Sequence, residues 1–220
     1  ADTRAANMAV YEYLVPVIKG WSTEMSQDVT RDGVQVHGGM GFIEETGSAQ
    51  HYRDAKILTI YEGTTAIQAN DLVGRKTVRD GGAVAKGIIA QVRATEAQLG
   101  AAGGADFAAI ARQLGGGSAA LEAVVDYMVA NIKTDIKGVF AGSVPYLRLA
   151  GIVLGGWQMA RAALVAQQKL DAGEGDAAFY KAKIATARFF ADHILSQAPG
   201  LRASIVDGSA GVLAMAEDQF

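Results

Sequence analysis

Apolar side chains recur every three or four residues along most of the chain, which is the period of an amphipathic α-helix. The first such series consists of Met8, Tyr11, Val15 and Ile18. Pro16 falls inside it and is expected to kink or restart the helix. Four glycines within residues 29–43 then predict a helix end followed by a loop, because glycine weakens a helix by roughly 1 kcal/mol relative to alanine.

Two further helices are predicted before residue 80. One covers about residues 49–58, where the pattern resumes. The other starts near Thr65, because Thr65-Ala66-Ile67-Gln68 has the form of a capping box, with Thr65 as the N-cap and Gln68 reaching back to it.

Beyond Asp80, glycine-rich points separate five amphipathic stripes. The predicted turns are Gly81-Gly82, Gly103-Gly104 and Gly115-Gly116-Gly117, and the stripes cover residues 84–99, 121–136, 149–170, 180–194 and 201–215. Small residues around Gly156 would let a neighbouring helix approach closely. No segment alternates with period two for long enough to predict a strand. The expected fold is all-α, with one helical unit at 1–80 and a helical bundle at 81–220, joined near residues 74–82.

Composition and charge exclude several classes of function. Half of the 220 residues are hydrophobic and only three are proline, as in a folded helical protein. Residues 1–80 carry 8 basic and 11 acidic side chains and the remainder carries 12 of each, so neither part has the basic excess that nucleic acid or an anionic membrane requires. The run between Arg148 and Arg161 has 12 uncharged residues, whereas a bilayer takes roughly 20. We therefore expect no nucleic-acid or membrane partner.

Cysteine is absent, and the three histidines show no metal-ligand spacing, so we expect no metal site. The chain starts at Ala1 without a basic and apolar leader, which predicts a cytoplasmic protein. The missing initiator methionine favours a piece of a longer protein.

Glu62 is the most suggestive carboxylate. It follows Ile60-Tyr61, precedes Gly63 and lies just before a predicted helix, where its side chain could project into an apolar cleft. Burial would make the carboxylate more basic and the helix N-terminus would make it less so. Such a group could abstract a weakly acidic C–H proton. The alternative is a solvated or capping glutamate.

Other residues have both a functional and a structural interpretation. Gly38-Gly39-Met40-Gly41 could bring bare backbone against a phosphate or a flat ring, or could simply form a tight turn between helices. The hydroxyls of Thr64 and Thr65 could donate to a phosphate, although capping explains them equally well. Arg53-Asp54 is interpreted as a structural ion pair, and His37 and His51 as packing or hydrogen-bonding residues.

Three segments together resemble the C-terminal helical domain of acyl-CoA dehydrogenases, in both order and spacing. They are QVHGGMGF at 35–42, YRDAKI at 52–57 and IYEGT at 60–64. The segments EETG at 44–47 and QANDLVGRK at 68–76 look like a large subfamily that carries an additional helical domain at the C-terminus. Residues 81–220 resemble that additional domain more weakly.

The resemblance implies α,β-dehydrogenation of an acyl-CoA thioester with FAD as cofactor, Glu62 removing the α-proton. It also implies that Gln35, Val36, His37, Gly38 and Gly39 touch FAD held mainly by a neighbouring subunit, that Gly63 lies against the substrate thioester, and that Thr64, Thr65 and Ala66 contact FAD. The partners it implies are the acyl-CoA substrate, electron-transfer flavoprotein as electron acceptor, and further copies in a homo-oligomer.

Enzymes of this family also have an N-terminal helical domain and a middle β-domain that build much of the site, and neither is present in these residues. The 220 residues alone are therefore expected to be inactive. Two alternatives remain: a non-catalytic helical oligomerisation module, and an acyl-CoA oxidase, which shares the chemistry up to flavin reduction.

Overall fold

The structure, a computed structural model, describes residues 2–219, and every regular element among them is a helix. The first elements are α1 (Asp2–His37), α2 (Gly39–Phe42), η1 (Glu44–Thr46), α3 (Ser48–Ile57), α4 (Thr65–Val73) and the π-turn η2 (Gly74–Val78). They are followed by α5 (Ala83–Ala102), α6 (Ala105–Asn131), α7 (Ile136–Ala141), α8 (Ser143–Asp171), α9 (Ala177–His193), η3 (Leu195–Gln197), α10 (Ala198–Val206), α11 (Ser209–Val212) and η4 (Glu217–Gln219). The all-α prediction is confirmed.

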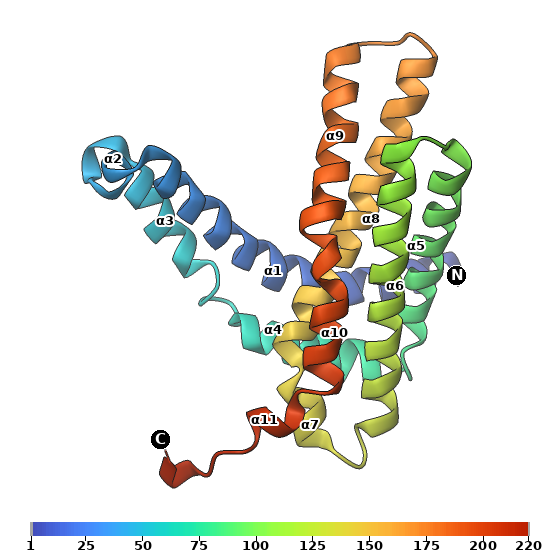
Figure 1. Cartoon of the computed structure of the whole chain (residues 1–220). Coiled ribbons are helices and arrows are strands. Elements are labelled where there is room, and N and C mark those ends of the chain that lie inside the picture. The colour runs from blue at the N-terminus through green and yellow to red at the C-terminus, as the bar shows by residue number, and fades with distance from the viewer. Residues whose placement is uncertain (1, 220) are drawn as a thin grey trace.

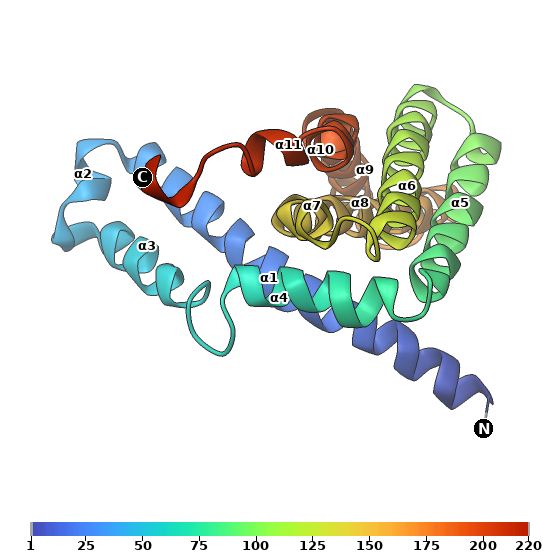
Figure 2. The same cartoon turned by 90° about the horizontal axis from the view of Figure 1, so that it is seen from below.

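The helices form an upright bundle with a projecting arm. Helices α5, α6, α8 and α9 stand side by side, and α10 continues below α9 (Figure 1). Helix α1 crosses the bundle, and its second half extends beyond it, where α2 and α3 complete the arm (Figure 1). Helix α4 lies along α1 at the base of the bundle and also packs on α8 (Figure 2). The arm is therefore continuous with the layer formed by α1 and α4 at the base of the bundle.

Helix α1 is longer and less interrupted than its sequence predicts. It runs through Pro16 without a restart and continues to His37, so the loop expected within residues 29–43 begins only at Gly38, where φ is +59°. Tertiary packing accounts for the passage through Pro16, since Tyr13 and Val17, on either side of it, are both buried in the core.

The glycine-rich points divide into turns and packing sites. Gly81-Gly82 and Gly103-Gly104 have positive φ and separate helices, as predicted. The run Gly115–Gly117 was expected to be a turn, and this is wrong, because it lies inside α6. A Cβ on Gly117 would stand 2.8 Å from Leu195 Cδ1 and 3.2 Å from Val153 Cγ2. Glycine is needed here for close helix packing rather than for a change of direction.

Small residues on α8 let its neighbours approach the backbone. The predicted close approach at Gly156 is confirmed, since a Cβ there would lie 2.9 Å from Leu195 Cδ2. A Cβ on Gly151 would collide with the Trp21 ring of α1, and one on Gly155 would lie 2.8 Å from the same ring. Where α1 crosses α8, the Trp21 ring therefore packs directly against the glycine backbone of α8.

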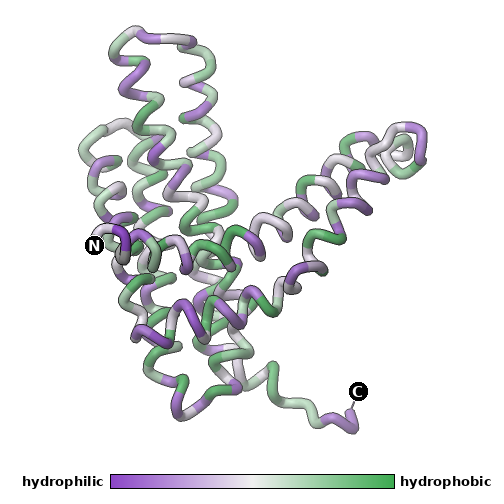
Figure 3. Tube along the Cα trace, turned by 180° about the vertical axis from the view of Figure 1, so that it is seen from behind, coloured by the Kyte–Doolittle hydropathy of each residue, from purple (hydrophilic) through white to green (hydrophobic). Residues whose placement is uncertain are grey.

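The buried core joins both predicted units. Tyr13 of α1 and Leu72 and Val73 of α4 belong to the same apolar cluster as the helices beyond residue 80. The division at residue 80 stays a prediction, and extensive apolar packing crosses it. By contrast, the series that marks the first helix, Met8, Tyr11, Val15 and Ile18, is exposed. Apolar positions continue along the arm beyond the bundle (Figure 3).

Helix α8 is the central helix of this core. By length and composition it could cross a membrane, alone among the helices of residues 2–219, with a mean hydropathy of 1.4 over its most apolar window. More than half of that window, 56%, is buried inside the protein. Such burial is typical of a core helix in a folded bundle.

Three hydroxyl groups tie the first part of the chain to α8. Tyr146 lies 3.0 Å from the hydroxyl of Tyr13 in α1 and 2.9 Å from that of Thr77 in η2, and all three residues are buried. Burial raises the pKa of Tyr146 from 10.0 to about 12, against the opposing effect of its two hydrogen bonds. Burial also raises the pKa of Tyr13 well above its usual value.

We predict that Tyr146→Phe lowers the free energy of unfolding by about 1–3 kcal/mol near neutral pH, because Tyr13 and Thr77 lose their shared partner. A raised pKa in the folded state means that the neutral phenol contributes fully below pH 10.0 and that this contribution is lost as the pH rises to about 12. The difference between variant and wild type should therefore shrink over that range in urea titrations. Tyr127→Phe, at a half-buried tyrosine whose hydroxyl has no hydrogen bond within residues 2–219, is the control. A constant difference up to pH 12 would contradict the assignment.

Candidate functional site

The Glu62 turn, residues 58–64 between α3 and α4, is a short, closed loop. The N–H of Thr65 donates to the carbonyl of Thr59 at 3.3 Å and so joins the two ends of the loop. Glu62 has φ +52° and is the one non-glycine residue with positive φ among the described residues, and Gly63 follows it with φ +91°. A left-handed glutamate is strained, and such strain is typical of functional sites.

Helix α4 begins at the predicted place, with a different cap. Thr64 is the N-cap: its hydroxyl accepts from the N–H of Ile67 at 3.5 Å. The expected N-cap, Thr65, is already helical, and its hydroxyl donates to Glu24 of α1. Gln68 does reach back, but its amide donates to the carbonyl of Glu62 at 3.4 Å. Since Thr64 only accepts here, its hydroxyl proton remains available to a ligand.

Two side chains of α1 hold the Glu62 turn. Lys19 Nζ donates to the carbonyl of Leu58 at 2.6 Å and lies 5.3 Å from the centre of the Tyr61 ring. Glu24 accepts from Thr65 at the other end. Sequence reasoning missed both residues, because 39 positions separate Lys19 from Leu58 and 41 separate Glu24 from Thr65, and no motif marks either pair.

Glu62 itself is exposed. The sequence suggested an apolar cleft around it, but within residues 2–219 neither of the two hollows described below includes it. The backbone N–H groups of Glu62 and Gly63 engage no hydrogen bond within residues 2–219. The turn therefore presents a carboxylate and two free backbone donors on the surface.

The other predicted group of site residues lies at the tip of the arm. Gln35, Val36 and His37 end α1 and Gly38 and Gly39 lead into α2, and all five are exposed. His37 hydrogen-bonds through Nδ1 to the carbonyl of Gly33 at 2.8 Å, as a hydrogen-bonding histidine should. No atom lies within 4 Å of a Cβ built on Gly38 or Gly39, so backbone is open here. Because α3 separates this tip from the Glu62 turn, the chain does not bring the two groups together.

Beside the tip, Arg53 forms a two-pronged ion pair with Glu44, at 3.0 and 2.8 Å. The expected pair between Arg53 and Asp54 does not form. The hydrogen bonds and charge of Arg53 hold the pKa of Glu44 below its usual value. An apolar hollow of about 620 Å³ lies against this pair, with Val34, Phe42, Ile43, Ala49 and Tyr52 as its other walls.

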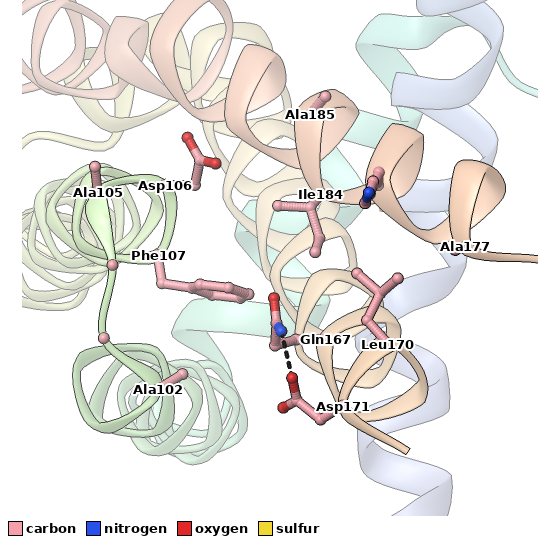
Figure 4. Close-up of a pocket in the computed structure, with 13 residues that line it drawn as sticks. Ala102, Ala105, Asp106, Phe107, Gln167, Leu170, Asp171, Ala177, Ile184 and Ala185 are labelled. Atoms are coloured by element: carbon pink, nitrogen blue, oxygen red, sulfur yellow. Dashed lines mark hydrogen bonds between the residues drawn. The ribbon is translucent and has the colours of Figure 1, made fainter. Parts of the chain in front are cut away.

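A second hollow, of about 910 Å³, lies between the α5–α6 turn, the end of α8 and the start of α9 (Figure 4). Phe107 and Ile184 point into it, and Gln167 donates to Asp171 at 2.7 Å on its wall (Figure 4). It contains none of the candidate catalytic or binding residues that the sequence suggested. No group of three His, Asp or Glu side chains among residues 2–219 suits a metal ion.

A strained glutamate before a capped helix, carried by an all-helical chain, agrees with the family that the motifs suggested. The family model described as acyl-CoA dehydrogenase, C-terminal domain, matches residues 2–76, and that described as acetyl-CoA dehydrogenase C-terminal like matches residues 88–216. The chain belongs to the acyl-CoA dehydrogenase family.

Several curated relatives are similar over most of this chain. A 3-methylmercaptopropionyl-CoA dehydrogenase from Ruegeria pomeroyi is 49% identical over 94% of the chain and 35% of the relative. A broad-specificity linear acyl-CoA dehydrogenase from Mycobacterium tuberculosis is 37% identical over 84% of the chain and 31% of the relative. A caffeyl-CoA reductase-Etf complex subunit from Acetobacterium woodii is 40% identical over 23% of the chain and 13% of the relative. The chain thus spans about a third of the length of the first two.

We predict that the backbone strain at Glu62 lowers the free energy of unfolding by a measurable amount. Glu62→Gly and Glu62→Ala both remove the carboxylate, but only glycine adopts φ +52° without steric cost. The glycine variant should therefore be more stable than the alanine variant by about 1 kcal/mol in urea unfolding. Equal stabilities, or a more stable alanine variant, would mean that the turn relaxes and that the left-handed conformation is not enforced.

Proposed function

We propose that this chain is the base-bearing C-terminal part of a flavin-dependent acyl-CoA dehydrogenase, with Glu62 as the base. The proposal rests on the left-handed conformation of Glu62, which lies in a turn fixed between two helices. This segment matches the family's C-terminal domain. Strain of this kind persists only where the surroundings enforce it.

In the proposed reaction the Glu62 carboxylate takes the proton from the α-carbon of the acyl thioester. The β-carbon loses a hydrogen with its electron pair, and the C–C single bond becomes a double bond. FAD, when bound, supplies the two-electron acceptor for that hydride. The free N–H groups of Glu62 and Gly63 suit the thioester carbonyl oxygen, on which negative charge grows as the proton leaves. This gives Gly63 its proposed contact with the substrate.

Four of the residues proposed to contact FAD, namely Thr64, Ala66, Gly38 and Gly39, fit a nucleotide in two places. The N-terminus of α4 offers the Thr64 hydroxyl proton and the N–H of Ala66, which has no hydrogen bond within residues 2–219, and a helix N-terminus favours phosphate. The open backbone of Gly38 and Gly39 at the arm tip permits close approach of a flat ring. Because the two places lie at opposite ends of α3, they would serve two different flavins, one of them held mainly by another subunit.

The remaining partners are also proposals. Large apolar side chains on the arm, such as Val36 at 83% and Phe42 at 80% exposure, favour a homo-oligomer in which these surfaces are covered. One relative is named as a subunit of an Etf complex, which supports electron-transfer flavoprotein as the electron acceptor. The acyl-CoA substrate follows from the family.

We predict that Glu62→Gln in the full-length enzyme lowers the rate of flavin reduction by acyl-CoA about 10²–10⁴-fold, because the amide keeps the size and loses the basicity. Stopped-flow bleaching of the flavin measures this rate. Glu45→Gln, an exposed glutamate of η1, is the matched control and should reduce flavin at the wild-type rate. Wild-type bleaching in Glu62→Gln, with flavin content unchanged, would refute the assignment of the base.

We also predict that the 220 residues alone do not hold FAD after desalting, because two separated contact sites on one chain cannot complete a binding site. Absorbance of the desalted protein at flavin wavelengths decides this. A stoichiometric yellow complex would show that the chain carries a whole flavin site.

A further inference from the structure

The Glu62 turn is attached to α1 at both of its ends, by Lys19 to the carbonyl of Leu58 and by Glu24 to the hydroxyl of Thr65. Resting on the proposed role of Glu62, we propose that Lys19 and Glu24 are positioning residues that fix the base from its two sides. Neither side chain needs to touch the substrate. Each acts through the backbone or side chain to which it is bound.

The Lys19 contact stabilises the end of α3. The carbonyl of Leu58 is the C-cap carbonyl of α3, where helix carbonyls lack internal partners and the helix dipole is negative. The ammonium donates to it at 2.6 Å and also lies 5.3 Å from the centre of the Tyr61 ring, the residue before Glu62. A charge-assisted hydrogen bond combined with a cation–π contact holds both the start of the turn and the neighbour of the base.

The Glu24 contact has the opposite sign and stabilises the start of α4. Its carboxylate accepts a hydrogen bond from the hydroxyl of Thr65. Thr65 is the first residue of α4, where the helix dipole is positive. Helix α1 therefore presents a cation to the helix that ends before the turn and an anion to the helix that begins after it. Each charge is opposite in sign to the helix dipole at the end that it contacts.

The stretch of α1 between these two residues is fixed to the core. A Cβ on Gly20 would lie 2.5 Å from Leu147 Cδ2 of α8 and 3.2 Å from Gln68 Cβ of α4, so the backbone here touches both helices. Trp21 packs on the bare backbone of Gly151. Gln68 in turn donates to the carbonyl of Glu62. Lys19 and Glu24 thus flank a stretch of α1 that is packed tightly against α4 and α8, and this packing fixes the position of both side chains.

The test uses the full-length enzyme and separates kcat from KM. Lys19→Met keeps the side-chain stem and removes the ammonium, and Glu24→Ala removes the acceptor. Each should lower kcat about 10–100-fold, because a displaced catalytic group loses rate steeply, with KM changed less than about 2-fold. Lys19→Arg and Glu24→Gln retain a donor and an acceptor and should restore most of kcat. Lys56→Met, an exposed lysine on α3, is the control and should leave kcat unchanged.

Coupling to Glu62 distinguishes positioning from general damage. In the Glu62→Gln background, Lys19→Met should slow flavin bleaching less than about 2-fold, because no base remains to be positioned. Equal slowing in both backgrounds, no slowing in either, or failure of Lys19→Arg to restore kcat would overturn the positioning role while leaving Glu62 as the base. If Glu62→Gln bleaches at the wild-type rate, the proposed function fails, and the positioning role fails with it.

Discussion

The close approach of α1 to α8 is the constraint on which the rest of the structure depends. The indole of Trp21 packs where Gly151 and Gly155 expose backbone, and Gly20 lets α1 approach both α8 and α4 closely. Larger residues on α8 would force the two helices apart and move every element carried by α1. The arm, the end of α3 and the start of α4 all take their positions from this crossing, so a packing detail in the core decides where a surface glutamate lies.

The site that results is a partial one. One chain supplies a carboxylate, two unengaged backbone donors and a capped helix start at one end of α3, and open glycine backbone at the other end. Between the two ends, α3 exposes the apolar side chains of Tyr52 and Ile57 among polar ones. In the proposed function this face is completed by other parts of the enzyme, which is consistent with a chain that spans about a third of the length of its first two relatives.

Local chemistry made part of this molecule predictable. The start of α4 and the turns at Gly81-Gly82 and Gly103-Gly104 follow from neighbouring residues, and the structure has each of them in place. Two errors came from features that local sequence does not distinguish. A glycine run that permits close packing inside α6 has the same composition as one that makes a turn. The anchoring side chains, Lys19 and Glu24, meet partners about 40 positions away with no periodicity to reveal them.

The hydroxyl chain of Tyr13, Tyr146 and Thr77 bears on how such proteins can be recombined. Each of the three groups lies in a different segment, 133 positions apart at the widest, and each is buried and hydrogen-bonded within the trio alone as far as residues 2–219 show. A chimera that keeps Tyr13 and Thr77 from this protein but takes its later helices from a member without a tyrosine at position 146 would leave two buried hydroxyls unsatisfied. In such a chimera the residues at these three positions should accordingly come from the same parent, together with Trp21 and the glycines at the α1–α8 crossing.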